Sequence, residues 1–415
     1  MKPTNIGNSD LITQVNRRLV LQAVRSLQPT YRAEVSRRTR LKPATVTGIV
    51  DNLLSEELLQ EVRGETKAPT PAGGRPPLML ELNGDARRVL AIDLEADVMR
   101  VAVVDLKMKL LRYEQEEIDR FAKPEPTVKK IVALSRRLIR ECNGRKLDGI
   151  GLSLPGLIDK DQGILISSTN MPNWHNVPIR DMISEKLELV PQLERSSRLA
   201  AMYEDWVDGS EQRSTKLILS LRTGIGMSLI QKGEPYVGAG GFDGEIGHTV
   251  VDLNGEKCDC GGYGCLETFV SAGAVNRRAE EMIKRGRCKA VADAVREGRS
   301  LRPELIYQLA KSGDKDCCEI VRDVGHYVGI AAANLVNLLA PDTLVLCGSI
   351  DTADELLLEV VEQQIEERTL PQMRRHLTIR LASGREKSSL FGAAVLGIRD
   401  LFELPRLLHP QTSLT

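Results

Sequence analysis

Four potential metal ligands lie close together in the second half of the chain. His248 is followed by Cys258, Cys260 and Cys265, and several glycines surround the cysteines. One imidazole and three thiolates form the closed tetrahedral set typical of structural zinc, and glycine permits the tight turn that cysteines one residue apart require. We therefore predict a structural Zn²⁺ site with no position open for catalytic water. The alternative is unliganded, reduced cysteines beside a core histidine.

The N-terminal segment carries a helix-turn-helix pattern. Apolar residues at helical spacing predict a helix over Val15–Leu27, a short helix over Arg32–Arg38 and a recognition helix over Pro43–Leu54. Two predicted strands follow, Leu58–Val62 and Leu78–Leu82, with a Gly- and Pro-rich loop between them. A hairpin after a recognition helix is a wing, so a winged helix-turn-helix is expected.

The same segment is strongly basic. From Arg17 to Lys42 there are eight basic residues and one acidic residue. Such a charge suits DNA phosphates, although a solvated helix face is the alternative. The predicted DNA-binding residues are Arg32, Lys42, Thr45, Thr47 and Arg75. The helix would read the major groove and the wing a narrow minor groove, which predicts a dimer on a palindromic, A·T-rich operator.

The bulk composition excludes several classes of protein. The 415 residues have zero formal net charge, 42% hydrophobic and 27% charged residues, as in ordinary globular proteins. Residues 1–20 carry Asp10, Arg17 and Arg18 without a long apolar run, and no stretch approaches the roughly 18 apolar residues of a membrane span. We expect a cytoplasmic protein without a secretory signal or membrane insertion.

Strands and helices alternate after the wing, which predicts an α/β fold. Arg88–Leu94 and Val98–Asp105 are predicted to pair across a short turn. Long helices are predicted over Ala272–Arg285 and Asp316–Leu339, and a last helix over Leu390–Leu401.

The sequence resembles the ROK family of repressors, open reading frames and kinases, from about Asn8 to Leu401. The resemblance rests on Arg222–Gly226, Gly244–His248, Cys258–Glu267, Asn16-Arg17, Arg32-Ala33-Glu34, Thr45-Val46-Thr47 and Gly74–Pro77. It implies a winged helix-turn-helix over residues 1–83, with the wing or linker at 64–77, then a two-lobed, actin-like (ribonuclease H-like) sugar-kinase fold over 84–415. The small lobe would span about 84–195 plus a helix at about 388–403, and the large lobe about 196–387 with the zinc loop at 248–265. A homodimer or homotetramer is also implied.

The resemblance further implies a sugar site. Glu245, His248 and Glu267 match family positions that face the sugar, and Asn170 matches a pocket asparagine. Carboxylates accept paired hydrogen bonds from vicinal hydroxyl groups. His248 would bind zinc through one ring nitrogen and face the sugar with the other. Alternatively, the two glutamates only hold the zinc loop together.

Several residues depart from the kinase pattern. Ser196 stands where the family has its aspartate base, and a serine hydroxyl cannot take the proton of an attacking alcohol. The first phosphate loop has Glu95-Ala96 in place of two glycines, and the second begins with Arg222. Residues 347–349 likewise replace a glycine pair. These changes predict that phosphoryl transfer is lost.

Arg195 and Arg198 flank Ser196 and could recognise a phosphate or carboxylate. They predict a sugar phosphate or acidic sugar as effector, unless both face solvent or form structural ion pairs. The overall prediction is a sugar-responsive, DNA-binding repressor without enzymatic activity. Two alternatives are an ATP-dependent sugar kinase acting on a hexose 6-hydroxyl, and a docking partner of a sugar-transport protein.

Overall fold

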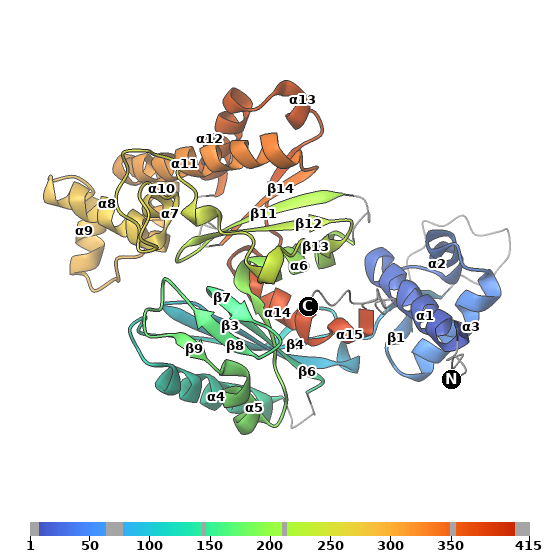
Figure 1. The fold of residues 1–415 in the computed structure, drawn as a ribbon. Helices are drawn as coiled ribbons and strands as arrows, with labels where there is room; N and C mark the ends of the chain where they lie inside the picture. Colours follow the sequence, from blue (N-terminus) through green and yellow to red (C-terminus); the bar gives the residue numbers. More distant parts are fainter. Residues whose placement is uncertain (1–7, 64–77, 143–146, 210–213, 349–353, 403–415) are drawn as a thin grey trace, which may run out of the picture.

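The structure of the protein is a computed structural model (Figure 1). The structure describes residues 8–63, 78–142, 147–209, 214–348 and 354–402. A small N-terminal unit is followed by two α/β lobes, and the last helices return to the region between the lobes and the N-terminal unit (Figure 1). None of the helices in the described ranges is both long and apolar enough to cross a membrane.

The N-terminal unit contains the predicted helix-turn-helix and hairpin. Its elements are α1 (Asn8–Leu27), α2 (Arg32–Thr39), α3 (Pro43–Ser55), β1 (Leu59–Val62) and β2 (Met79–Leu82). β1 and β2 are antiparallel, with Leu59 opposite Leu82. α1 begins at Asn8, before the predicted Val15; Leu11 and Ile12 continue the helical spacing toward the N-terminus, but Ile12 is exposed and adds nothing to the core. Residues 64–77, the predicted wing tip, lie outside the described residues.

The first lobe is built on a five-stranded sheet in the order β10-β6-β3-β4-β5. Its strands are β3 (Arg88–Leu94), β4 (Val98–Asp105), β5 (Leu110–Glu117), β6 (Gly149–Leu154) and β10 (Gln192–Arg195). β3 pairs antiparallel with β4, as predicted, and parallel with β6. Helices α4 (Pro124–Glu141) and α5 (Ile179–Leu187) and a small sheet of β7 (Leu157–Asp159), β8 (Ile164–Ser167) and β9 (His175–Val177) complete it.

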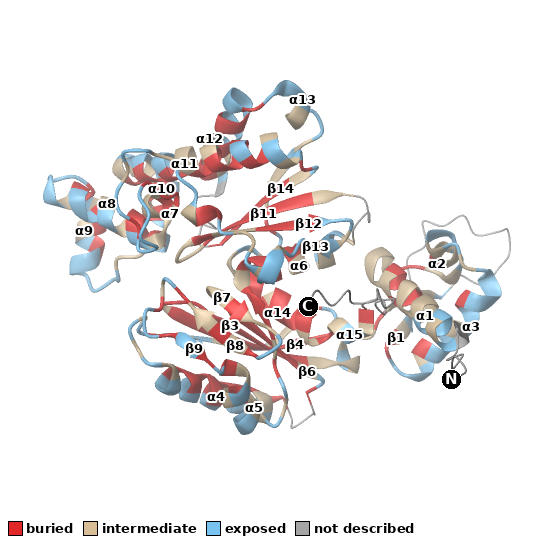
Figure 2. Ribbon diagram, in the orientation of Figure 1, coloured by how far each residue is buried: buried red, intermediate tan, exposed pale blue. Residues whose placement is uncertain are grey.

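The second lobe repeats this plan around a sheet in the order β13-β12-β11-β14-β15. The strands are β11 (Thr215–Leu221), β12 (Ile225–Gln231), β13 (Glu234–Pro235), β14 (Thr343–Gly348) and β15 (Thr378–Leu381). The helices are α6 (Ser196–Asp208), α7 (Glu267–Val270), α8 (Ala272–Lys284), α9 (Lys289–Arg296), α10 (Pro303–Lys311), α11 (Lys315–Leu339), α12 (Asp354–Arg368) and α13 (Pro371–Arg374). The central strands β3, β4, β6, β11 and β14 are almost fully buried (Figure 2), which explains their nearly continuous apolar sequence, whereas the edge strands β5, β13 and β15 contain no buried residue.

The C-terminal helix predicted over Leu390–Leu401 is two helices, α14 (Ser388–Gly397) and α15 (Arg399–Phe402). Ile398 leaves the helical region at φ −115° and breaks the run, although its apolar side chain continues the helical pattern. α14 packs tightly on the first lobe, because a Cβ added at Gly151 would lie only 1.8 Å from the Ala393 carbonyl oxygen. It also crosses α6, where a Cβ at Gly392 would lie 2.0 Å from the Leu199 carbonyl oxygen.

One hydrophobic core joins the N-terminal unit to the first lobe. Val24, Val50 and Leu82 belong to the same cluster as Val104 of β4 and Phe402 of α15. The N-terminal unit is therefore seated on the end of the first lobe and on the C-terminal helices.

Candidate functional site

A cavity opens between the two lobes, where β6, β10, the β11–β12 turn and α7 come together. Five of the predicted sugar-site residues line it: Asn170, Arg195, Glu245, His248 and Glu267. Ser196, the first residue of α6, also lines it. Arg198 does not, and its side chain is only 4% exposed.

Glu267 and Asn170 converge over the β11–β12 turn. A Cβ added at Gly224 would lie 2.2 Å from Glu267 Oε2 and 3.1 Å from Asn170 Nδ2, so only glycine admits both side chains here. The Ile225 N–H donates to Glu267 Oε2 at 3.3 Å. Burial raises the pKa of Glu267. The turn thus positions a carboxylate and an amide side by side.

Glu245 lies between Arg195 and His248. Arg195 Nη2 donates to Glu245 Oε1, and Glu245 Oε2 lies 3.9 Å from His248 Nε2. The other terminal nitrogen of Arg195 donates to the carbonyl oxygens of Gly241 and Asp243. Arg195 therefore reaches the cavity, but its donors are directed at protein groups.

Arg198 is held in a buried network behind the cavity. Its two terminal nitrogens contact Glu194 Oε1 at 2.8 Å and Asp243 Oδ1 at 2.7 Å. Glu194 also binds Lys160 Nζ at 2.7 Å. Because two acids pair with its terminal nitrogens, Arg198 belongs to a buried ion-pair network and does not lie at the cavity surface.

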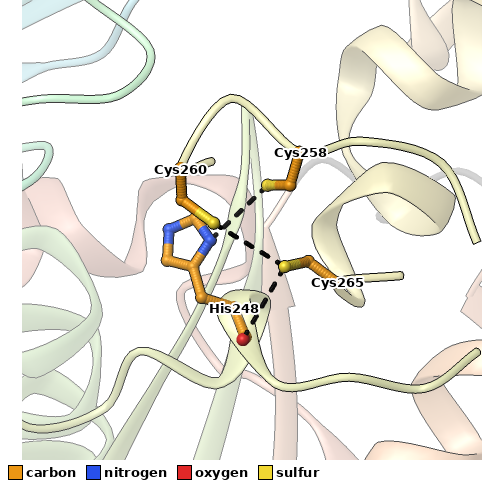
Figure 3. Close-up of side chains that lie close together, drawn as sticks. All are labelled: His248, Cys258, Cys260 and Cys265. Atoms are coloured by element: carbon orange, nitrogen blue, oxygen red, sulfur yellow. Dashed lines mark hydrogen bonds between the residues drawn. The ribbon is translucent and has the colours of Figure 1, made fainter. Parts of the chain in front are cut away.

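The four predicted metal ligands come together where His248, at the end of η3 (Ile246–His248), meets the three cysteines of the following loop (Figure 3). Their ligand atoms all lie within 4.8 Å of one another. Cys260 Sγ lies 3.7 Å from Cys265 Sγ, and His248 Nδ1 lies 3.7 Å from Cys258 Sγ. Two thiolates bound at about 2.3 Å to one tetrahedral zinc ion lie about 3.8 Å apart, so the cluster fits such an ion. Since Nδ1 faces the sulfurs, Nε2 is left on the side of Glu245.

A buried cluster of four charges, which we term the charge quartet (Asp93, Glu95, Arg100 and Arg222), adjoins the cavity, and its members Glu95 and Arg222 line the wall. Arg222 Nη2 lies 2.8 Å from Asp93 Oδ2 and 2.5 Å from Glu95 Oε1. Arg100 contacts Glu95 and lies 3.4 Å from Asp93. Burial alone would raise the pKa of Asp93, but Arg222 and Arg100 hold it below its usual value.

The charge quartet was not predicted as a unit. From the sequence, Arg222 and Glu95 were each interpreted as the loss of a phosphate-loop glycine. One feature of the sequence could have revealed the cluster. Glu95 and Arg222 carry opposite charges and lie in the two predicted phosphate loops, which were expected to face each other across the cleft. Arg222 also donates to Ser389 Oγ of α14 and to the Glu386 carbonyl oxygen at 3.2 Å.

The N-terminal unit exposes the start of α3. Lys42 precedes α3, and Thr45 and Thr47 lie on its exposed face. Thr47 Oγ1 donates to the Pro43 carbonyl oxygen at 3.0 Å. Arg32 instead bridges Asp51 of α3 at 2.9 Å and Glu61 of β1 at 3.1 Å. Arg75 lies outside the described residues.

The two-lobed architecture and this cleft match a known family. The family profile described as "ROK family" matches residues 89–400. The chain belongs to the ROK family. This ROK chain is 27% identical over 405 residues to the xylose repressor of Caldicellulosiruptor bescii, covering 96% of this chain and 99% of that protein. It is 28% identical over 413 residues to the transcriptional dual regulator NagC of Escherichia coli, covering 97% of each.

Solved structures of ROK proteins have the same fold. A ROK family transcriptional regulator, described as a homolog of the Escherichia coli MLC protein, superposes with a TM-score of 0.74 at 25% identity, covering 95% of this chain and 97% of that chain. A ROK family glucokinase from Streptomyces griseus superposes with a TM-score of 0.66 at 22% identity, covering 75% and 99%. The predicted fold, an N-terminal winged helix-turn-helix joined to an actin-like sugar-kinase fold, is confirmed.

Proposed function

We propose that this ROK protein is a sugar-responsive, DNA-binding transcriptional regulator, acting as a repressor in the cytoplasm, whose cleft binds a sugar without phosphorylating it. The observation that carries the proposal is the charge quartet, which places buried, paired charges in the two loops predicted to bind phosphate, while the predicted sugar residues Asn170, Glu245 and Glu267 line the cavity. The similarity to proteins named xylose repressor and NagC over nearly the whole chain supports the same function.

The charge quartet argues against the kinase alternative. A nucleotide phosphate needs free backbone N–H groups and a metal ion in this region. Here Glu95 and Arg222 pair with each other and with the rest of the charge quartet, so neither side chain is free to bind a phosphate or its metal ion. Ser196 supplies no carboxylate base on the sugar side. ATP binding and phosphoryl transfer are therefore both disfavoured.

The ion pairs of the cleft favour a neutral sugar over a sugar phosphate. The charges of Arg195 and Arg198 are offset by Glu245, Glu194 and Asp243. An acidic ligand would have to displace one of these carboxylates. A neutral sugar can instead use Glu267, Asn170 and the side of Glu245 that faces His248. The sugar phosphate predicted from the two arginines is thus the less favoured effector.

The metal cluster has a structural role in this proposal. Zn²⁺ held by His248, Cys258, Cys260 and Cys265 would complete four-coordinate geometry and leave no site for a reacting water. It would fix the His248 ring so that Nε2 faces the sugar side. The zinc loop would then contribute to sugar binding only by orienting the His248 ring.

For DNA, we propose that Lys42, Thr45 and Thr47 reach the major groove and Arg75 a minor groove of an A·T-rich palindrome, bound by a dimer or tetramer. The exposure of the first three at the start of α3 supports their role. Arg32, tied to Asp51 and Glu61, suits the positioning of α3 against the hairpin better than a direct contact.

Isothermal titration calorimetry with D-xylose, N-acetyl-D-glucosamine, D-glucose and the 6-phosphates of the last two tests the effector, and a coupled ADP-release assay on the same panel tests the chemistry. We expect a neutral sugar to bind and no sugar to stimulate ADP release. Turnover of ATP with any of these sugars at about 1 s⁻¹ or faster, the usual range for kinases, would refute the proposal in favour of a kinase.

A further inference from the structure

Helix α6 begins at the cavity and ends at the DNA-binding unit. Arg195, Ser196 and Ser197, at its N-terminal end, line the cavity. Its 13 residues span about 20 Å. Its last turn contacts α1: Arg25 Nη1 donates to the Trp206 carbonyl oxygen at 2.7 Å, and the Arg25 guanidinium lies 4.4 Å from the centre of the Trp206 ring. Helix α6 therefore contacts both the cavity and the N-terminal unit.

α1 also rests on the C-terminal helix α15. Gln22 Nε2 donates to the Phe402 carbonyl oxygen at 2.7 Å, and Arg18 donates to the Asp400 carbonyl oxygen at 3.3 Å. The Trp206 ring meets the edge of Phe402, with ring centres 4.7 Å apart and planes at 82°. Trp206 thus lies where α6, α15 and α1 come together.

The two helices that contact α1, α6 and α15, are fixed to different lobes. Glu204 of α6 is fully buried and binds Arg380 of β15 at 2.7 Å, while Lys216 of β11 binds Asp205 and Asp208. These pairs fix α6 to the second lobe. α15 instead continues from α14, whose tight packing on Gly151 fixes it to the first lobe.

Helices α6 and α14 pack closely where they cross. Gly392 of α14 lies against the backbone of Leu199 of α6, and the Tyr203 ring of α6 stacks on Phe391 of α14 with ring centres 4.8 Å apart. Because α6 is fixed to the second lobe and α14 to the first, a rotation of one lobe against the other would turn the two helices about this crossing. A ligand that draws the lobes together would rotate α6 about this point. The end of α6 would then shift against α15, beneath α1.

We infer that α6 carries the state of the cleft to the DNA-binding unit, and that Trp206 is the positioning residue through which it moves α1. The inference rests on the proposed function and names the route of its regulation. A ligand at the N-terminal end of α6 and DNA at the N-terminal unit are coupled because both bias the same rotation of α6. Trp206 itself contacts neither ligand.

The test uses the full-length protein and a DNA duplex that the wild type selects from a random library, with and without sugar. Fluorescence anisotropy measures duplex affinity with D-xylose, N-acetyl-D-glucosamine or D-glucose present, and calorimetry measures sugar affinity. We expect a sugar to change the wild-type DNA affinity by about tenfold or more. Trp206→Leu should bind the sugar, and should bind DNA in the absence of sugar, with the affinities of the wild type. Its DNA affinity should change by less than about threefold when the sugar is added. Trp206→Phe, which retains an aromatic edge, should keep most of the response.

A full response in Trp206→Leu would overturn the inference and leave the proposed function standing. A wild type whose DNA affinity is unaffected by any of the sugars would overturn the proposed function and the route together. If Trp206→Leu does not fold, hydrogen exchange on the wild-type protein tests whether sugar binding reaches α1. Sugar should then alter the protection of amides in residues 18–27, and unchanged protection would overturn the inference.

Discussion

Arg222 and Asp93, which are 129 residues apart in the sequence, form a 2.8 Å ion pair that joins the two lobes. Asp93 is fully buried and the Arg222 side chain is 9% exposed. The protein therefore balances these buried charges internally.

Arg222→Ala should strongly destabilise the protein. Removing one partner of a buried ion pair leaves an uncompensated charge and typically costs about 3–5 kcal/mol. The matched control is Arg296→Ala, because Arg296 is 76% exposed and pairs with Asp293 on the surface, where such pairs contribute about 0–1 kcal/mol. Urea unfolding measures both, and equal losses in the two variants would contradict a structural role for the charge quartet.

The stability should fall at acidic pH through Asp93. Its pKa in the fold lies below the ordinary value of 3.8 because of Arg222 and Arg100. A lowered pKa means that the stabilisation is complete above about pH 4 and is lost as the pH falls through the lower value. Asp93→Asn should be less stable at neutral pH and lose less stability on acidification. The free energy of unfolding, measured by urea unfolding at each pH, checks this. If it falls equally with pH in the wild type and in Asp93→Asn, Asp93 does not titrate in this way.

Removal of the metal should destabilise the second lobe. Because thiolate ligands bind zinc only in the folded loop, chelation is expected to lower the melting temperature by about 5 °C or more. Cys260→Ala should lose the metal, whereas Cys318→Ala, whose thiol contacts the Ala310 carbonyl oxygen, should keep it. Atomic absorption on the purified variants measures the zinc content. Retention of zinc by Cys260→Ala would rule out the proposed ligand set.

Lys42→Ala and Arg32→Ala should affect DNA binding differently. Loss of one phosphate contact reduces the slope of log affinity against log salt by about 1. We expect this of Lys42→Ala, with the fold unchanged. Arg32→Ala should lower thermal stability, because it breaks the bridge between α3 and β1, and should leave the salt slope nearly unchanged. The opposite pattern would make Arg32 the phosphate contact.

Ser196→Asp should not create a sugar kinase. The substitution restores a carboxylate at the base position, but Glu95 and Arg222 still occupy the phosphate side. The coupled ADP-release assay should therefore stay at background with every neutral sugar tested. Measurable turnover by this single variant would mean that the charge quartet admits ATP.

The helix-turn-helix, the paired strands β3 and β4 and the metal cluster could be predicted because their signals are local. His248 and the three cysteines lie on one short loop, so spacing alone brings them together. Boundaries were less certain where the pattern is ambiguous, as in the exposed start of α1 and at Ile398, whose apolar side chain hides a helix break.

Ion pairs between distant segments could not be predicted in the same way. Arg195 and Arg198 looked available to an acidic ligand, but Glu245 and Asp243, about 50 residues further along, neutralise them in the fold. Likewise, nothing in the residues near Trp206 indicates that α1 lies against it. Such contacts depend on how the lobes pack, which local periodicity does not encode.

The hydrophobic core that runs from α1 through β4 to Phe402 has a consequence for modular design. The N-terminal unit is not an independent module, because residues of the first lobe and of the C-terminal helices complete its hydrophobic core. An isolated N-terminal unit would expose these apolar residues and aggregate. N-terminal units exchanged between relatives would function only if the residues of the first lobe and of α15 that pack against them were exchanged as well.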